Sequence, residues 1–384
     1  MSPDEIRTRI ESRFPELGEV GRDAWIVGGA IRDAILGRLS PDLDLAVGDA
    51  AAAAVELGRR TGGKVVALGR ERFAAWRVIA GPRSFDLSEL TGGEIGRDLA
   101  RRDFTINAMA IPVGGAARLE DPYDGRIDLG RRMVRMISPE NLRDDPLRVV
   151  KAARMAAVLS FTIEEETLAA CRDLAGEIDT VAPERIGVEI DAMFGAGSPG
   201  TARLALAEIG LDRGIFGREL PAALDRLKGG DAVLALAVIY RGASDREVRD
   251  AVRRLRWPAA RREAVRAVFG LDRALHGLTP DPGRIDLALF DAGEEAADRT
   301  ASLLEAFGET PLCALVRARL DARGAELFAT RPLLSGEEIS AATSLPPGPA
   351  IGRLKRALLE AQIRNEVLTR QDAERHLKAL MIED

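Results

Sequence analysis

The pattern of hydrophobic and polar positions changes character at about residue 137. Between Asp23 and Ile137, short β-rich runs alternate with helical stretches such as Ala50–Arg60. Gly-Gly pairs at 62–63, 92–93 and 114–115 separate these elements as turns. This part of the chain is therefore predicted to be an α/β or α+β domain. The runs expected to form strands are Trp25–Val27, Leu43–Val47, Lys64–Leu68, Ala74–Ile79 and Arg83–Leu90.

From Ser138-Pro139 onward the sequence is rich in Ala, Leu, Arg and Glu, with apolar residues at helical spacing. Interruptions by Gly and Pro mark the expected ends of helices. We find no internal repeat and no low-complexity tract. The remainder is predicted to be almost entirely helical, with breaks at 195–200, 229–230, 279–283, 310–311 and 345–349.

Length and composition exclude several classes of protein. A chain of 384 residues is long enough for two to four domains. The two cysteines, Cys171 and Cys313, lack metal-ligand spacing, so we expect buried thiols in a reducing compartment, the cytoplasm. The longest apolar run, Ala232–Tyr240, is too short to span a bilayer, so no membrane partner is expected. With only two histidines, catalysis must depend on carboxylates and metal.

The net charge of −6 neither supports nor excludes a nucleic-acid partner, because a basic face can coexist with an acidic whole. Aromatic residues make up only 4% of the chain, so base stacking cannot be the main mode of recognition. Eight arginines against three acidic residues lie within Arg246–Arg266, on two expected helices broken at Trp257-Pro258. This segment is a candidate phosphate-binding surface. The favoured alternative is a solvated helix face with i, i+4 ion pairs.

The most informative motif is Gly28-Gly29-Ala30-Ile31-Arg32-Asp33, followed nine residues later by Asp42-Leu43-Asp44. Carboxylates at i and i+2 of a strand project from one face, where they can share divalent cations such as Mg²⁺. The Gly-Gly turn lets backbone N–H groups at a helix start approach a triphosphate. Each piece alone is weak, but their fixed order indicates a site that polymerises nucleotides.

A further segment carries polar groups that suit a nucleotide, and another is structural. In Arg101–Ala110, paired arginines can neutralise a triphosphate, and Asp103 with Asn107 can hydrogen-bond a ribose. The structural alternative is an arginine–aspartate pair that holds two elements together. The sequence Asp121-Pro122-Tyr123-Asp124-Gly125 is interpreted as a turn.

The segment Asp144–Arg154 is expected to read a base. On a helix, Asp145, Arg148 and Lys151 would follow one ridge, whereas Arg154 would lie on the opposite side. A carboxylate accepts from the amino group of cytosine or adenine, while an adjacent guanidinium donates to a ring acceptor on the same edge; this pair rejects uracil and guanine. The alternative is that Asp145 caps a helix whose first residue is Pro146.

Taken together, these motifs resemble the class II tRNA nucleotidyltransferases, the family of CCA-adding enzymes and bacterial poly(A) polymerases. The resemblance covers nearly the whole chain. The segments similar to the family's catalytic, ribose, hinge, nucleotide-reading and following motifs are Gly28–Asp44, Arg101–Ala110, Asp121–Gly125, Asp144–Arg154 and Pro183–Ile186; the stretches 333–336, 348–349 and 352–366 are similar to its tail.

This resemblance implies an α+β fold. A nucleotidyltransferase head with a mixed β-sheet (1–137) would precede a helical neck that reads the base (138–205), a helical body (206–325) and a helical tail (326–384), the last two binding tRNA. Asp42 and Asp44 would hold two Mg²⁺ ions that activate the RNA 3′-hydroxyl and steady the departing pyrophosphate. Asp86 would be a third catalytic carboxylate. The implied nucleotide-binding residues are Gly28, Gly29, Arg32, Arg102, Asp103, Asn107, Asp145, Arg148, Lys151 and Arg154.

The expected activity is Mg²⁺-dependent, template-independent extension of the tRNA 3′ end from CTP and ATP. The chain departs from the family pattern in having Asp144 for Glu and Lys151 for Arg, and in having only Thr91–Ile95 between the strand of Asp86 and the next helix. Because CC-adding relatives lack much of a longer loop there, addition of CC alone is an alternative. Others are a poly(A) polymerase, a catalytically silent RNA-binding protein and a protein-modifying nucleotidyltransferase.

Overall fold

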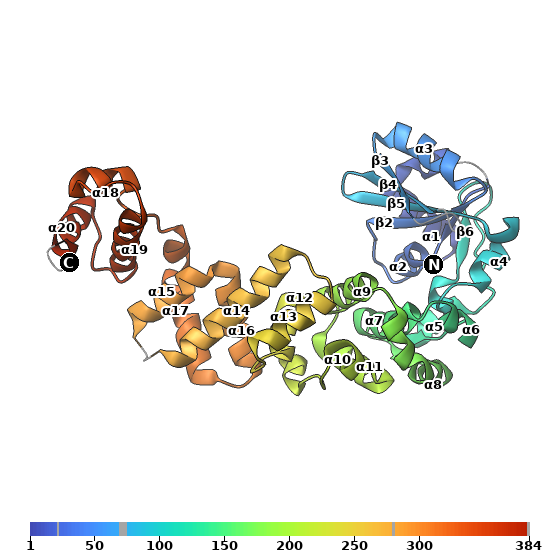
Figure 1. Ribbon diagram of the computed structural model, residues 1–384. Helices are drawn as coiled ribbons and strands as arrows, with labels where there is room; N and C mark the ends of the chain where they lie inside the picture. Colours follow the sequence, from blue (N-terminus) through green and yellow to red (C-terminus); the bar gives the residue numbers. More distant parts are fainter. Residues whose placement is uncertain (21–22, 69–74, 279–280, 382–384) are drawn as a thin grey trace. The chain divides into compact units, whose positions relative to one another are not determined.

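A computed structural model describes residues 1–20, 23–68, 75–278 and 281–381. The chain forms two compact units, Met1–Glu219 and Leu220–Asp384. Strands occur in the first unit, and the second is helical (Figure 1). In the described part after residue 137, the elements are helices apart from one two-residue strand (Thr162–Ile163), so the predicted, almost entirely helical remainder is confirmed. The finer division into head, neck, body and tail stays a prediction.

A six-stranded mixed sheet forms the centre of the first 112 residues, with the strand order β3-β4-β5-β2-β1-β6. Strands β2 and β5 are parallel, and the other neighbours are antiparallel. The strands predicted from sequence are confirmed to within one residue over the described part, and Ala74 lies outside it. The bounds are β1 (Trp25–Val27), β2 (Asp42–Val47), β3 (Lys64–Leu68), β4 (Ala75–Ala80), β5 (Arg83–Glu89) and β6 (Ala110–Pro112).

Alternation along β2 and β5 fixes which face of the sheet is buried. Leu43 and Leu45 on β2 lie beside Phe85 and Leu87 on β5, and all four are fully buried. Helix α3 packs over this sheet with its apolar face of Ala50, Ala54 and Leu57. Because the side-chain period of a strand is two, the intervening aspartates must point to the opposite face. The hydrophobic core thereby sets the direction of the carboxylates.

The rest of the first unit is mostly helical. Its centre is α7, which packs against α9 and α10 and buries Val149, Val150 and Ala153. The two-residue strands β7 (Met133–Val134) and β8 (Thr162–Ile163) pair in parallel; they were not predicted, because two residues carry no periodicity. The α-helices of this unit are α1 (Pro3–Arg13), α2 (Gly29–Ile35), α3 (Ala50–Thr61), α4 (Ile95–Ala100), α5 (Gly125–Arg131), α6 (Pro139–Asp144), α7 (Leu147–Leu159), α8 (Glu165–Leu174), α9 (Pro183–Ala196), α10 (Pro199–Ile209) and α11 (Leu211–Phe216).

Short 3₁₀ helices connect several of these elements. They are η1 (Pro15–Glu19), η2 (Thr91–Gly93), η3 (Thr105–Asn107), η4 (Ala175–Thr180) and, in the second unit, η5 (Ala222–Arg226). The turn predicted at Asp121–Gly125 is confirmed: the Asp121 carboxylate accepts from the N–H groups of Gly125 (2.7 Å) and Arg126 (2.9 Å). This turn lies just before α5.

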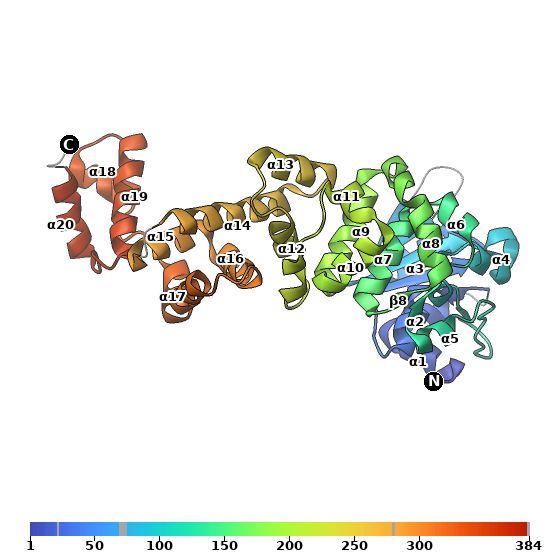
Figure 2. The same ribbon diagram turned by 90° about the horizontal axis from the view of Figure 1, so that it is seen from below.

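The second unit contains two separate hydrophobic clusters. One includes Leu271, Leu289 and Leu304 and lies among α14–α17; the other includes Ile339 and Leu358 and joins α18–α20, which form a group in Figure 2. The helices are α12 (Ala232–Ile239), α13 (Asp245–Arg254), α14 (Ala259–Gly277), α15 (Pro282–Ala292), α16 (Glu294–Ala306), α17 (Thr310–Ala329), α18 (Gly336–Thr343), α19 (Pro349–Ile363) and α20 (Arg370–Leu380).

Most of the predicted helix breaks are confirmed. Helix α9 ends and α10 begins within 195–200, segment 229–230 precedes α12, and α18 and α19 are separated around 345–349. The break at 279–283 falls partly on residues 279–280, outside the described residues, although α14 ends before it and α15 begins within it. At 310–311 the break is the start of α17.

Buried polar groups link helices of the second unit. The fully buried Asp286 on α15 accepts from Arg319 (2.7 Å) and Arg323 (2.8 Å) on α17. Nearby, Arg241 pairs with Asp272 (2.7 Å) and Glu309 (2.7 Å). These ion pairs tie together helices that are distant in sequence.

Both cysteines are buried free thiols, as predicted, and burial raises the pKa of Cys171 to about 12. Over the described ranges, we find no helix that combines the length and the apolar character needed to cross a membrane.

Candidate functional site

A hollow of about 430 Å³ in the first unit collects almost every residue singled out from the sequence. Its walls come from the β1–α2 turn, β2, the segment around η3 and α7. Of the predicted site residues, only Asp86 does not line it, and Met155 is the lining residue that was not predicted. The lining residues are Gly28, Gly29, Arg32, Asp42, Asp44, Arg102, Asp103, Asn107, Asp145, Arg148, Lys151, Arg154 and Met155.

Gly28 joins β1 to α2 in a conformation that favours glycine. Its φ is +74°, and a Cβ placed there would come within 2.9 Å of Asp44 Oδ2 and of an Arg102 guanidinium nitrogen. Both the backbone angle and the close approach therefore require a residue without a side chain. The glycine allows the turn to lie directly against the carboxylate of β2.

The three strand carboxylates have different surroundings. Asp42 is exposed, and its Oδ1 accepts from the Ser84 hydroxyl at 2.6 Å. Asp44 is half-buried, and burial raises the pKa of its carboxyl, while the charge of Arg102 acts in the opposite direction. Asp86 lies beside Asp44 in the register of β2 and β5, but both its oxygens accept from Arg77, at 2.7 and 2.6 Å. The predicted third carboxylate is therefore held in a bidentate ion pair.

A chain of hydrogen bonds crosses the floor of the hollow. Arg32 donates to Asn107 Oδ1 (2.7 Å), and Asn107 Nδ2 donates to Asp103 Oδ1 (3.0 Å). Arg32 also donates to both carboxylate oxygens of Asp33, at 2.9 and 3.0 Å. Burial by itself would raise the pKa of Asp103, but Lys151, Asn107 and the N–H of Phe104 together lower it. Asp103 is thus an anion that these bonds hold in place.

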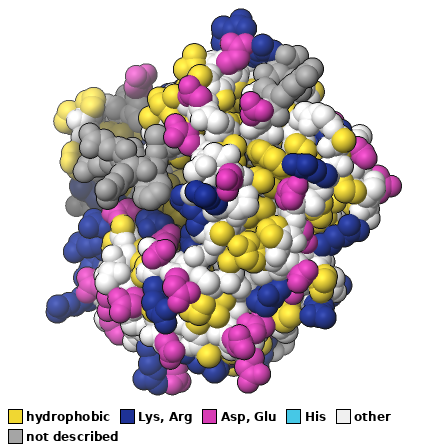
Figure 3. Space-filling model, turned by 90° about the vertical axis from the view of Figure 1, so that its right-hand side faces the viewer, with side chains coloured by type: hydrophobic (Ala, Val, Ile, Leu, Met, Phe, Trp, Pro, Cys, Tyr) yellow, Lys and Arg dark blue, Asp and Glu magenta, His cyan; other side chains and the backbone are white. Residues whose placement is uncertain are grey.

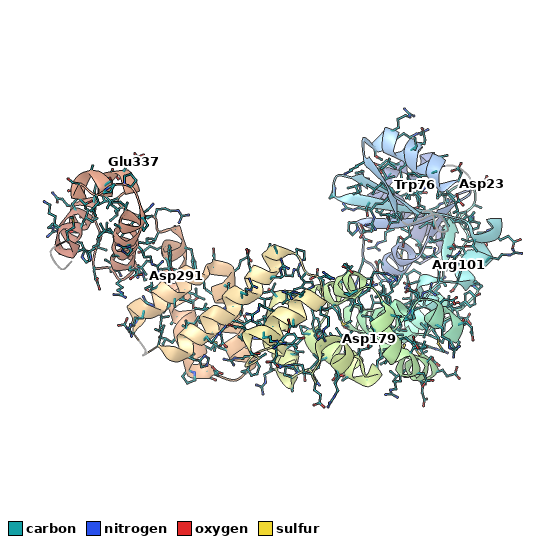
Figure 4. All side chains as sticks on the ribbon, in the orientation of Figure 1. Asp23, Trp76, Arg101, Asp179, Asp291 and Glu337 are labelled. Carbon is teal, nitrogen blue, oxygen red and sulfur yellow. The ribbon has the colours of Figure 1, made fainter. Side chains whose placement is uncertain are left out.

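Arg102 follows α4 and is partly neutralised by a residue of that helix. Its Nε and Nη2 donate to the buried Asp98 at 3.1 and 2.9 Å, while its third nitrogen faces Gly28. The structural alternative, an arginine–aspartate pair that holds two elements together, is not what this pair forms, because Asp98 is only four residues before Arg102. Arg102 itself lines the hollow. Arg101, labelled in Figure 4, instead does not line the hollow.

The sequence interpretation of Asp145 was wrong in its geometry. Asp145 lies between α6 and α7 in an extended conformation (φ −144°, ψ 91°), because Pro146 disfavours helical geometry in the residue before it. It therefore shares no helical ridge with Arg148. It does not cap α7 with its side chain either; Oδ2 accepts from Arg185 of α9 at 2.9 Å. Asp145 still lines the hollow, with its carboxylate held by a residue that the sequence did not single out.

The placement of Arg154 on the opposite side was also wrong. Since Asp145 is outside the helix, only residues 148, 151 and 154 define the face, and spacings of three spread them over about 120° of the helix surface. Arg148 donates to the carbonyls of Asn141 and Arg101, both at 2.8 Å. Arg154 donates to the buried Glu189 on α9.

Besides Met155, sequence reasoning missed Arg185 and Glu189. Both lie on α9, one turn apart, and each forms an ion pair with a residue that lines the hollow. Arg185 belongs to the motif Pro183–Ile186, so its position was noted, but the motif assigned it no role. The only signal was its one-turn spacing from Glu189, which many helix faces show.

The arginine-rich segment Arg246–Arg266 forms the two helices expected, α13 and α14, broken at Trp257-Pro258. The alternative of i, i+4 pairing holds for Arg246, which lies 3.8 Å from Asp250. It does not describe the whole segment, because Arg249, Arg253, Arg262 and Arg266 line a cleft between the two helices. Figure 3, by comparison, shows basic and acidic side chains interspersed over the face at the right of Figure 1.

Comparisons with known proteins point to one family. Two family models match: "Poly A polymerase head domain" at residues 24–92 and 73–135, and "Probable RNA and SrmB- binding site of polymerase A" at 160–224. The A-adding tRNA nucleotidyltransferase of Deinococcus radiodurans is 34% identical, with coverage of 94% of this chain and 96% of the relative. The CC-adding enzyme of Geobacter sulfurreducens is also 34% identical, with 93% and 92% covered.

A solved structure shares the fold over the full length. The CCA-adding enzyme of Bacillus stearothermophilus, determined in complex with CTP, matches with a TM-score of 0.75 and 23% identity, covering 100% of this chain and 99% of that one. The α+β fold predicted from sequence is confirmed. The two relatives, each aligned over more than nine-tenths of its length, decide the family: the chain belongs to the class II tRNA nucleotidyltransferase and poly(A) polymerase family.

Proposed function

We propose that this protein extends the 3′ end of tRNA without a template, adding C and A from CTP and ATP with release of pyrophosphate. The observation that carries the proposal is the meeting of two kinds of group in one hollow. Asp42 and Asp44 from the sheet lie there with Asp145 and Arg148 from the helical part. One set suits phosphoryl chemistry and the other suits recognition of a base edge. The names of the relatives support the choice of tRNA.

The donor set fits Mg²⁺. Asp42 and Asp44 offer hard oxygen ligands from one face of β2, and no group of three or more potential ligand side chains competes with them among the described residues. Burial opposes the charge of Asp44, so a cation beside it would be favoured. We propose that these two residues hold the metal. When bound, it would supply Lewis-acid activation of the RNA 3′-hydroxyl and charge neutralisation at the pyrophosphate.

The nucleotide would be held by residues on three sides. The turn at Gly28 and Gly29 leaves room for phosphates, and Lys151 with Arg154 adds positive charge. On the base side, Asp145 Oδ2 is occupied by Arg185. Oδ1 then remains to accept from the amino group of cytosine or adenine, and a carboxylate cannot donate to the carbonyl of uracil or guanine. This assigns base selection to Asp145.

A second candidate function is addition of CC alone. The structure favours it at one point: β5 ends at Glu89 and α4 begins at Ile95, so only a short 3₁₀ turn connects them. The named activities of the relatives include both A addition and CC addition. A poly(A) polymerase would share the carboxylates and use ATP repeatedly.

One experiment separates these activities. The purified protein with Mg²⁺ is incubated with tRNAs that end before the CCA, at C, or at CC, with CTP, ATP or both. Products are then sized at single-nucleotide resolution. Growth by CCA supports the full activity, and arrest at CC supports the second candidate. Repeated A addition indicates a poly(A) polymerase. No growth with any nucleotide would refute the proposed function, and Asp44→Ala is the inactive control.

A further inference from the structure

A narrow cleft between α13 and α14 concentrates positive charge in the second unit. Its volume is about 250 Å³. Four arginines line it: Arg249 and Arg253 from α13, and Arg262 and Arg266 from α14, all of them exposed. Its remaining lining residues are Val248, Val252, Ala259 and Glu263. Against four guanidinium groups, the cleft contains a single carboxylate.

These four arginines differ from their neighbours in lacking carboxylate partners. Throughout the part of the chain that the structure describes, none of the four forms a salt bridge within 4.0 Å. By contrast, Arg246 pairs with Asp250, and Arg273 pairs with Asp245 at 2.8 Å. The pKa of Asp245 is lowered first by its hydrogen bond with Arg273 and less by the charges of Arg249 and Arg266. Asp245, whose pKa these two arginines affect, is thus already held by Arg273.

The spacing makes this arrangement unfavourable for the protein alone. Arg249 and Arg253 are four residues apart on one helix, as are Arg262 and Arg266 on the other, and like charges at i, i+4 repel. The two pairs also face the same cleft. The helices could tolerate neutral residues there, because the buried contacts come from Val248 and Val252. A bound anion would relieve the repulsion, and the apolar floor would strengthen its attraction to the guanidinium groups.

We propose that the cleft between α13 and α14 is a phosphate-binding site, separate from the nucleotide hollow of the first unit. Guanidinium forks match phosphate oxygens in geometry and charge. The phosphate could belong to an RNA backbone or be free inorganic phosphate. The RNA source rests on the proposed function; binding of phosphate by the cleft does not.

The first test measures thermal unfolding of the full chain in phosphate and in chloride at equal ionic strength. We expect phosphate to raise the Tm of the wild type more than chloride does, because it binds only the folded cleft. The double variant Arg253→Gln/Arg262→Gln should lose this extra rise, yet melt higher than the wild type at low salt without phosphate. The control variant Arg246→Gln, on α13 but outside the cleft, should keep the extra rise in Tm. The proposal would be overturned if phosphate and chloride raised the Tm of the wild type equally. It would also be overturned if phosphate raised the Tm of the double variant as much as that of the wild type.

A second test identifies the source of the phosphate. Affinity for an RNA hairpin without a tRNA 3′ end is measured over a range of salt concentrations. If the cleft contacts the RNA backbone, the double variant should bind the hairpin more weakly. The slope of the logarithm of the association constant against the logarithm of the salt concentration should then be flatter by about 2, one unit for each lost phosphate contact. Unchanged RNA affinity with loss of the phosphate response assigns the site to free phosphate. Failure of nucleotide addition would affect neither measurement, so the two proposals fail separately.

Discussion

Replacing Asp145 by asparagine tests the proposed base selection most directly. Asp145 lines the hollow, is fixed by Arg185 at 2.9 Å and has one carboxylate oxygen left to accept. Asparagine keeps the size of the side chain but adds an amide that can donate. If the NH₂ group turns toward the base, it can bond the carbonyl of uracil that the carboxylate rejects. We therefore expect Asp145→Asn to admit UTP while leaving the strand carboxylates untouched.

The magnitude follows from one hydrogen-bonding position on the base edge. A correctly placed pair discriminates against the wrong base by about 1–3 kcal/mol, and every 1.4 kcal/mol is a factor of ten. The ratio of kcat/KM for CTP to that for UTP should fall by roughly 5- to 150-fold. Arg185→Gln, which removes the clamp but keeps the carboxylate, should lower the ratio less, because Asp145 can still accept.

The assay is single-nucleotide addition to a tRNA that ends before the CCA, with CTP and UTP varied separately. Asp144→Asn is the matched control, since Asp144 is the adjacent acid, is exposed and does not line the hollow. It should leave the CTP to UTP ratio unchanged. If Asp145→Asn also keeps the wild-type ratio at normal activity, Asp145 does not read the base, and the selection proposed for it is refuted.

Three further predictions concern other parts of the molecule. Gly28→Ala should lower kcat/KM at least tenfold with an unchanged circular dichroism spectrum, because the added Cβ meets Asp44 at 2.9 Å and the left-handed backbone costs about 1–2 kcal/mol. The pKa of His276 is raised, mainly by its hydrogen bond with the Asp272 carbonyl and less by Glu309. Protonated His276 therefore stabilises the fold at pH 6, and this stabilisation is lost as the pH rises through the folded-state pKa. His276→Gln should therefore lower the free energy of unfolding at pH 6, by no more than about 1 kcal/mol because the side chain is 45% exposed, and change it little at pH 9; the Tm at the two pH values checks this. Asp286→Asn should lower the free energy of unfolding, measured in urea, by about 3 kcal/mol, because it leaves two arginines facing a buried neutral group. The control is Asp291→Asn, which removes an exposed ion pair with Arg356 and should cost under about 1 kcal/mol; Asp291 is labelled in Figure 4.

The sheet could be predicted because its signals are local. Alternation of apolar residues in 43–47 and 83–90 located β2 and β5, and the same alternation placed Asp42 and Asp44 together on the other face. β6 was missed, because it has only three residues and begins at the last residue of a motif chosen for its charges. Very short strands are defined by their partners rather than by their own pattern.

The membership of the hollow could also be predicted, but its internal bonds could not. Asp145, Arg148 and Lys151 were expected together because they are close in the chain, and they do line one hollow. The pairing of Asp145 with Arg185 joins residues 40 positions apart, and no periodicity connects them. Extrapolating a helix through Pro146 produced the errors at Asp145 and Arg154, since the turn before a proline is set by backbone sterics rather than by spacing.

The ion pair between Arg77 and Asp86 bears on how metal and nucleotide would bind. Asp44 and Asp86 lie side by side, and the charge of Asp86 contributes to the raised pKa of Asp44 after burial. Because Arg77 donates to both oxygens of Asp86, a cation at Asp86 would compete with that ion pair. Asp42 and Asp44 alone provide few ligands, and Mg²⁺ bound by one or two carboxylates usually completes its shell with substrate phosphates and water. We therefore expect metal affinity to be low without a nucleotide and to rise when the triphosphate enters, so that the two bind as a unit.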